Sequence, residues 1–179
     1  MNYNRREFIK TASILSGSLL LLPACSRQIK RYRVFTEQEA NCLIAMCEQI
    51  VPADEYPGAT EAGVIFYIDK QTDLRFPNER ELFCNGVASL QAWCKENHNQ
   101  LFENLDADIQ NEIMQSMGRN EIKSDIWTVS PKQFFDTLLM RTMQGFYGPP
   151  RHGGNKNYAS FRMMRLDYPQ LVGQNRYRA

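Results

Sequence analysis

The stretch that decides the fold is FTEQEANCLIAMCEQIVPAD, residues 35–54. Thr36 and Glu39 have the spacing of a capping box, in which each side chain bonds the other residue's backbone N–H at the start of a helix. The apolar residues that follow recur at helical spacing and mark one buried face. Pro52 has no backbone N–H and ends the pattern. We therefore predict an amphipathic helix that begins near Thr36 and ends before Pro52.

Four further segments show the same apolar spacing and are predicted to be helices, with Asp106 and Ser130 as N-caps of the last two. They cover residues 60–71, 78–98, 106–117 and 130–148. Gly86, inside the third helix of the chain, marks a close contact with another helix. No alternating pattern is long enough for a strand. The sequence therefore predicts an all-α fold, a single compact multi-helix domain over residues 35–179 with an irregular Gly/Pro-rich C-terminal segment.

The most unusual stretch of this domain is GFYGPPRHGGN, residues 145–155. Its glycines suit a backbone that turns sharply or approaches another group closely, and its aromatic pair with an arginine is typical of protein interfaces. We predict a partner interface here, made by Gly145, Phe146, Tyr147, Gly148, Gly153, Gly154 and Asn155. The alternative is a tight turn that packs against the protein's own helices. A phosphate-binding P-loop is disfavoured, because no Lys-Ser/Thr pair follows.

The first 24 residues have the composition of an export signal. Arg5 and Arg6 are followed by Phe8 and Lys10, and then by an uncharged run over residues 11–24. This run is shorter than the roughly 20 apolar residues that span a membrane, and the order of charged and apolar regions is that of a signal peptide. The arrangement resembles the twin-arginine signal, which exports already folded proteins. Residues 1–24 are therefore predicted to be removed.

The sequence LPAC, residues 22–25, resembles a lipobox, the site at which a cysteine is lipidated and becomes the new N-terminus. Lipidation of Cys25 would make residues 25–34 a lipid-anchored tether and place the protein on the periplasmic side, associated with the membrane. Pro23 departs from the usual lipobox residue. The alternative is ordinary cleavage after Ala24, with Cys25 left as a free thiol.

Composition narrows the class of protein. The chain has 179 residues, a length that fits one domain. Its net charge of +1 gives no argument for nucleic acid as a partner. Four cysteines remain if Cys25 is lipidated, namely Cys42, Cys47, Cys84 and Cys94. They could form disulfides between the two helices that carry them, or remain buried thiols.

Residues for chemistry are sparse. His98 and His152 lie in different segments, no Cys-x-x-Cys-His motif is present, and no Gly-x-Gly-x-x-Gly follows a strand. The acidic residues Asp54, Glu55, Glu61 and Asp69 could serve acid–base chemistry, but helix capping and solvent exposure also explain them. We therefore predict no catalytic, cofactor-binding or metal-binding residue in this chain, which is not expected to be an enzyme by itself.

Four motifs are spaced along the domain: Phe-Thr at residues 35–36, a hydrophobic-Pro-x-Asp run at 50–54, Pro-Gly-Ala-x-x-Ala-Gly-Val at 57–64, and the Gly-Phe-x-Gly and Gly-Gly-Asn of residues 145–155. Together they resemble gluconate 2-dehydrogenase subunit 3, the small subunit of membrane-bound, flavin-dependent sugar and sugar-acid dehydrogenases. The chain departs from this pattern at His152, where the family often has tyrosine, and after Asn155.

This resemblance implies an oxidoreductase complex. Its large subunit, of the glucose-methanol-choline type, would carry FAD and oxidise the substrate, and a cytochrome c subunit would take the electrons. The small subunit would supply the twin-arginine signal, escort its partner through the export machinery and help to anchor it through Cys25. The second interpretation is a stand-alone exported helical lipoprotein with a binding role.

Overall fold

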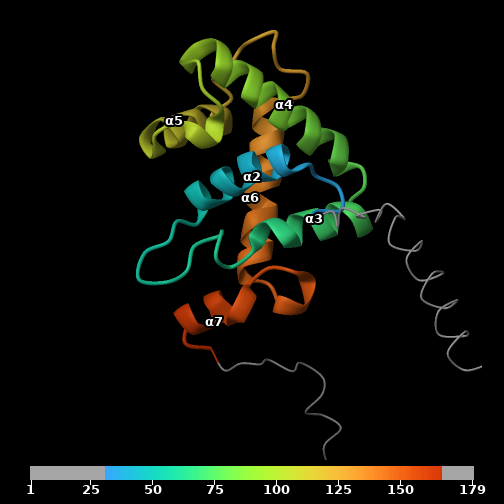
Figure 1. Cartoon of the computed structure of the whole chain (residues 1–179), viewed down its shortest axis with the longest axis vertical. Helices are drawn as coiled ribbons and strands as arrows, with labels where there is room; N and C mark the ends of the chain where they lie inside the picture. The colour runs from blue at the N-terminus through green and yellow to red at the C-terminus, as the bar shows by residue number, and fades with distance from the viewer. Residues whose placement is uncertain (1–30, 167–179) are drawn as a thin grey trace, which may run out of the picture. The chain divides into compact units, whose positions relative to one another are not determined.

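In the computed structural model, residues 31–166 are described (Figure 1), and within this range the protein consists of helices, turns and loops without any strand. The predicted all-α fold is confirmed. The α-helices are α2 (Glu37–Ile50), α3 (Val64–Leu74), α4 (Glu79–His98), α5 (Ala107–Gly118), α6 (Pro131–Tyr147) and α7 (Ala159–Met163). Three short 3-10 helices lie between them: η2 (Phe102–Asn104), η3 (Pro150–His152) and η4 (Lys156–Tyr158).

Helix α2 begins as the sequence predicts. The Thr36 hydroxyl accepts a hydrogen bond from the Glu39 backbone N–H at 3.2 Å, and the Glu39 carboxylate accepts one from the Thr36 N–H at 2.8 Å. This reciprocal capping box satisfies two donors that have no partner inside the helix. The helix ends at Ile50, two residues before Pro52.

Helix α3 begins later than the sequence predicts, at Val64 rather than near Thr60. Residues 59–63 form turns instead, and Gly63 immediately before the helix has φ +68°. This left-handed backbone cannot belong to a right-handed helix, and glycine adopts it without a steric penalty. The apolar spacing continues through the turn, which is why the pattern alone places the start too early.

One detail at the C-terminal end differs from the prediction. Helix α6 itself agrees with it: the helix begins after Ser130, whose hydroxyl accepts from the Gln133 N–H, and it runs to Tyr147, with Gly148 as its C-cap. The segment after it is only partly irregular, because η3, η4 and α7 form within it. Its last helix is five residues long and packs on α6, too short for a periodic signal in the sequence.

Helix α6 runs through the middle of the described domain, with α2, α3, α4 and α5 packed around it (Figure 1). Phe134 of α6 is fully buried and meets Phe83 of α4 edge to face, with ring centroids 6.3 Å apart. Phe83 in turn meets Phe35, the residue before the α2 cap, at 6.0 Å. These aromatic contacts connect the start of the domain to its central helix.

Gly86 of α4 makes the close contact that the sequence predicts. A Cβ atom built on Gly86 would lie 2.6 Å from the ring of Phe134, closer than carbon atoms can approach. The absence of a side chain lets α4 and α6 approach each other closely enough for Phe134 to fill the space between them.

Candidate partner interface

The glycine-rich loop after α6 packs on the protein's own helices. Gly153 has φ +116°, and a Cβ there would lie 3.0 Å from the backbone oxygen of Phe66 in α3. Gly154 is buried, and a Cβ there would collide with the backbone oxygen of Gly145 in α6. Gly145 itself faces the Tyr67 side chain, with 3.0 Å between that ring and an added Cβ. These glycines allow the loop, α3 and α6 to come into backbone contact.

Asn155 fixes the loop in place. It is fully buried, and its amide donates a hydrogen bond to the Gly148 carbonyl while its amide oxygen accepts from the Ser160 N–H, both at 2.9 Å. The next residue donates its backbone N–H to the Ala62 carbonyl at the turn before α3. Asn155 therefore closes the loop on itself and onto the start of α7, a polar role that the sequence does not reveal.

The structure thus divides the residues predicted to form an interface. Gly145, Phe146, Gly154 and Asn155 are buried within the domain, so their first role is intramolecular. Tyr147 is exposed, and Gly148 and Gly153 are half-buried. The buried ring of Phe146 contacts the ring of Tyr147 edge to face, with centroids 5.0 Å apart. The partner interface stays a prediction, and Tyr147 is the member of the set that offers a large side chain to it.

An ion pair beside this loop was not predicted. Arg141 of α6 is buried, and its guanidinium binds the Glu79 carboxylate with two nitrogens, Nε at 2.9 Å from Oε2 and Nη2 on Oε1. Its Nη1 donates to Gln144, and its carbon Cζ lies 3.5 Å from the centroid of the Phe76 ring. Arg141 thereby joins α6 to the start of α4. A lone arginine within an apolar helix pattern is the only sequence signal for it.

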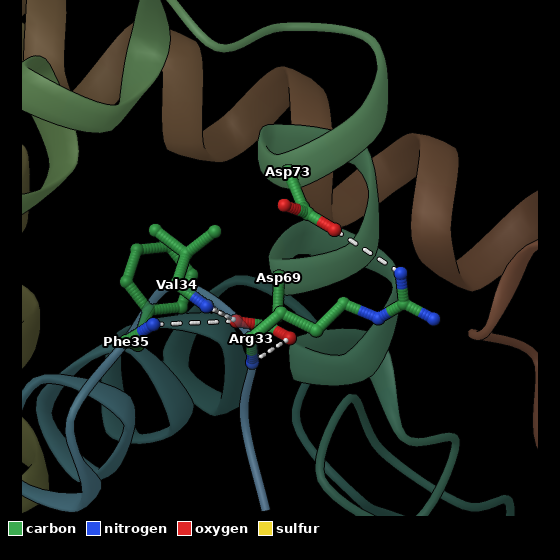
Figure 2. A network of polar contacts seen from close by, with 5 residues as sticks. All are labelled: Arg33, Val34, Phe35, Asp69 and Asp73. Atoms are coloured by element: carbon green, nitrogen blue, oxygen red, sulfur yellow. Dashed lines mark hydrogen bonds and ion pairs between the residues drawn. The ribbon is translucent and has the colours of Figure 1, made fainter. Parts of the chain in front are cut away.

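The N-terminal edge of the domain is held by a buried carboxylate, Asp69 of α3 (Figure 2). It accepts hydrogen bonds from the backbone N–H groups of Arg33 at 2.8 Å, Val34 at 2.9 Å and Phe35 at 3.3 Å. The Arg33 side chain also reaches Asp73, one turn further along α3, at 3.1 Å. We call these contacts the Asp69 junction. It makes residues 33 and 34, the end of the predicted tether, part of the folded domain.

Two of the acidic residues considered for catalysis, Asp54 and Asp69, make hydrogen bonds that shape the fold. Asp69 belongs to the junction, and Asp54 accepts the Tyr56 N–H within an exposed turn. The nearby carboxylate of Glu48 accepts from the N–H groups of Ala53 and Thr60, which shapes the loop before α3. Among residues 31–166, no three His, Cys, Asp or Glu side chains are grouped so that they could hold a metal ion.

The cysteines of the described domain are free thiols. Cys42, Cys47 and Cys94 are buried, and Cys84 is half-buried. Burial raises the pKa of Cys47 to about 12, although the 3.2 Å contact of its sulfur with the Thr142 hydroxyl acts in the opposite direction. Burial likewise raises the pKa of Cys94 to about 12 and that of Cys84 to about 11. Of the two alternatives left open by the sequence, buried thiols are what the structure contains.

These thiols are expected to react slowly while the protein is folded. A pKa of about 11 instead of 9.0 lowers the thiolate fraction of Cys84 near neutral pH roughly a hundredfold, and the thiolate is the reactive form. Labelling with iodoacetamide, mapped by mass spectrometry, should modify Cys84 first and should accelerate as the pH approaches 11. The same chain in denaturant is the control, in which all of them react. Rapid labelling of native Cys47 would contradict this environment.

A basic cluster surrounds His152 on the outside of the loop. A shallow pocket of about 290 Å³ is lined by Tyr67, Gln71, Arg75, Gln144, Gly148, Pro149 and His152. Burial lowers the pKa of His152, as do the charges of Arg151, Lys70 and Arg75 in that order. Lys70 also donates to the Arg151 carbonyl at 3.1 Å, which fixes α3 to η3. Arg75 therefore lines this pocket, and the charges of Lys70 and Arg151 lie close enough to act on His152 at its edge.

The residues of the predicted export signal and lipobox, namely Arg5, Arg6, Phe8, Lys10 and Cys25, lie outside the described residues. Within the described part of the chain, no helix is both long and apolar enough to cross a bilayer. The tether is described only from Arg31 onward, where the Arg31 guanidinium lies over the rings of Tyr32 and Phe66.

Comparison with known protein families gives a match over most of the domain. The family model for gluconate 2-dehydrogenase subunit 3 matches residues 37–167, from the first residue of α2 to just beyond the described range. No curated protein and no solved structure matches the chain significantly.

Proposed function

This chain belongs to the gluconate 2-dehydrogenase subunit 3 family and is thus a small subunit of a dehydrogenase complex, within which we propose that it is the non-catalytic partner of an FAD-bearing large subunit. The observation that carries the proposal is the family match over most of the chain. We further propose that it escorts the large subunit through twin-arginine export and helps to anchor it at the membrane through a lipidated Cys25. A cytochrome c subunit would accept the electrons.

The structure offers support for a binding role. The loop of residues 148–155 packs on α3 and α6 through its glycines, and Tyr147, at the end of α6 just before it, exposes a large aromatic side chain. The Asp69 junction fixes residues 33–35 to α3. A partner bound to the domain would therefore remain close to the membrane to which the tether is proposed to attach. A folded binding domain that follows an N-terminal export signal is the arrangement that an escort requires.

Export of the two subunits together is the experiment that tests this function. The tagged chain is co-expressed with the flavoprotein, and the exported fraction is purified and examined for a flavin absorption spectrum. We expect the wild-type chain to bring the flavoprotein with it. Replacing Arg5→Lys together with Arg6→Lys is expected to leave both proteins in the cytoplasm, because the twin-arginine machinery distinguishes these side chains.

The matched control makes the same conservative change at Arg27 and Arg31, downstream of the predicted signal, and should leave export unchanged. Normal export of the pair without the twin arginines would contradict the escort role. A wild-type chain that is exported alone and colourless would instead favour the stand-alone lipoprotein.

A further inference from the structure

The second half of α6 exposes an apolar stripe. Leu139, Met140, Met143 and Tyr147 are 36–45% exposed, although they are large hydrophobic side chains. A helix turns by about 100° per residue, so these four positions share one side of α6, while Leu138, Thr142 and Phe146 face the core. Methionine and aromatic residues are enriched at protein interfaces, and methionine adapts its shape to a partner.

The stripe carries no charge of its own. The exposed side of the first half of α6 has the ion pair Lys132–Asp136, at 2.8 Å. Beyond Asp136 the helix has one charged residue, Arg141, and that side chain is buried against Glu79. Permanent interfaces have such apolar, charge-depleted centres, whereas an ordinary solvent-facing helix does not need one.

The basic pocket of Arg75 and His152 borders the stripe. Gln144 lines that pocket and follows Met143 on α6, and it is held in place by the Tyr67 hydroxyl and by Arg141. Arg75, Lys70 and Arg151 form no ion pair with any acidic residue of the described part of the chain. An uncompensated positive charge thus lies at one edge of an uncharged apolar surface.

We propose that the apolar stripe of α6 and the adjoining basic pocket form the docking surface for the FAD-bearing large subunit, which meets the stripe with apolar side chains and the pocket with a carboxylate. This inference rests on the proposed function and assigns a surface to it. The family to which the chain belongs implies a partner subunit as the occupant, and a second copy of this chain, paired across the stripe by a two-fold axis, is the other outcome that the test distinguishes.

The test measures binding of the purified flavoprotein to variants of this chain. Met143→Glu places a charge in the apolar stripe, and we expect it to weaken binding at least about tenfold, as a disrupted interface centre does. Arg75→Glu replaces the positive charge of the pocket with a negative one, which would repel the partner's carboxylate, and should weaken binding as well. Added salt should weaken the wild-type complex more than the Arg75→Glu complex, because salt screens the attraction between Arg75 and the partner's carboxylate, which the variant no longer has.

Gln133→Glu is the matched control, since it places the same negative charge on an exposed position of α6 outside the stripe. It should bind like the wild type, and the circular dichroism and melting temperature of all variants should agree. Wild-type affinity of Met143→Glu and Arg75→Glu would overturn the docking surface and leave the proposed function standing. A wild-type chain that does not bind the flavoprotein would overturn the proposed function, and a chain that forms dimers sensitive to Met143→Glu would assign the stripe to a second copy.

Discussion

Gly154→Ala is expected to lower the free energy of unfolding by about 3 kcal/mol, the upper range for a methyl group forced into a packed site. The new Cβ would collide with the backbone oxygen of Gly145, and the carbonyl carbon would be 2.9 Å away. Both neighbours belong to the backbone of α6, so no side-chain rotation can make room. The loop must therefore move away from α6, and this movement would strain the two hydrogen bonds of the Asn155 side chain.

Gly118→Ala is the matched control, since it adds the same methyl group at the end of α5. Its nearest neighbour is the ring edge of Phe135 at 3.0 Å, a side chain that can move, and alanine favours the helix by about 1 kcal/mol over glycine. Chemical denaturation followed by circular dichroism should show a large loss for Gly154→Ala and little change for Gly118→Ala. Equal midpoints would mean that the loop is not packed as described.

Asp69→Ala should have a comparable effect, a loss of about 3 kcal/mol, because it removes a charged acceptor from three backbone donors. The N–H groups of Arg33, Val34 and Phe35 are at 2.8–3.3 Å from the Asp69 carboxylate, and that of Phe35 is buried. Buried donors without a partner are costly. The segment before α2 is therefore expected to detach, which hydrogen exchange of these amides would record as lost protection.

Asp73→Ala is its control on the same helix. Asp73 pairs with the Arg33 side chain, but both groups are about half exposed, and exposed ion pairs contribute roughly 0–1 kcal/mol. The two substitutions give the same residue in α3, so the difference between them measures the backbone contacts of Asp69. Retained amide protection in Asp69→Ala would show that residues 33–35 are held by other contacts, such as the stacking of Tyr32 on Phe66.

Most of the fold could be predicted from the sequence because it depends on local signals. The capping box of Thr36 and Glu39, the Ser130 cap and the apolar period act within a few residues, and the helices form where these signals lie. The close contact at Gly86 could be predicted too, although its partner Phe134 could not. The start of α3 was placed too early because a turn and a helix can share one apolar period.

The site depends on contacts between distant residues, which no local pattern encodes. Asp69 is separated by 34–36 residues from its three donors, and Arg141 by 62 from Glu79. The sequence distinguishes the glycines of residues 145–155 as unusual, but their spacing fits a partner interface and an internal backbone contact equally well. Only the distances to α3 and α6 show that Gly153 and Gly154 approach the protein's own backbone.

The Asp69 junction also gives the chain a mechanical attachment point. Tension applied upstream of Arg31 would first reach the buried Tyr32, which stacks on Phe66 of α3. It would then reach residues 33–35, where three backbone hydrogen bonds converge on one carboxylate of α3. All three bonds end on one side chain, so Asp69 would carry the load at this contact. The capped end of α2 lies beyond this point, so these contacts would have to open before a load from the N-terminal side reached α2.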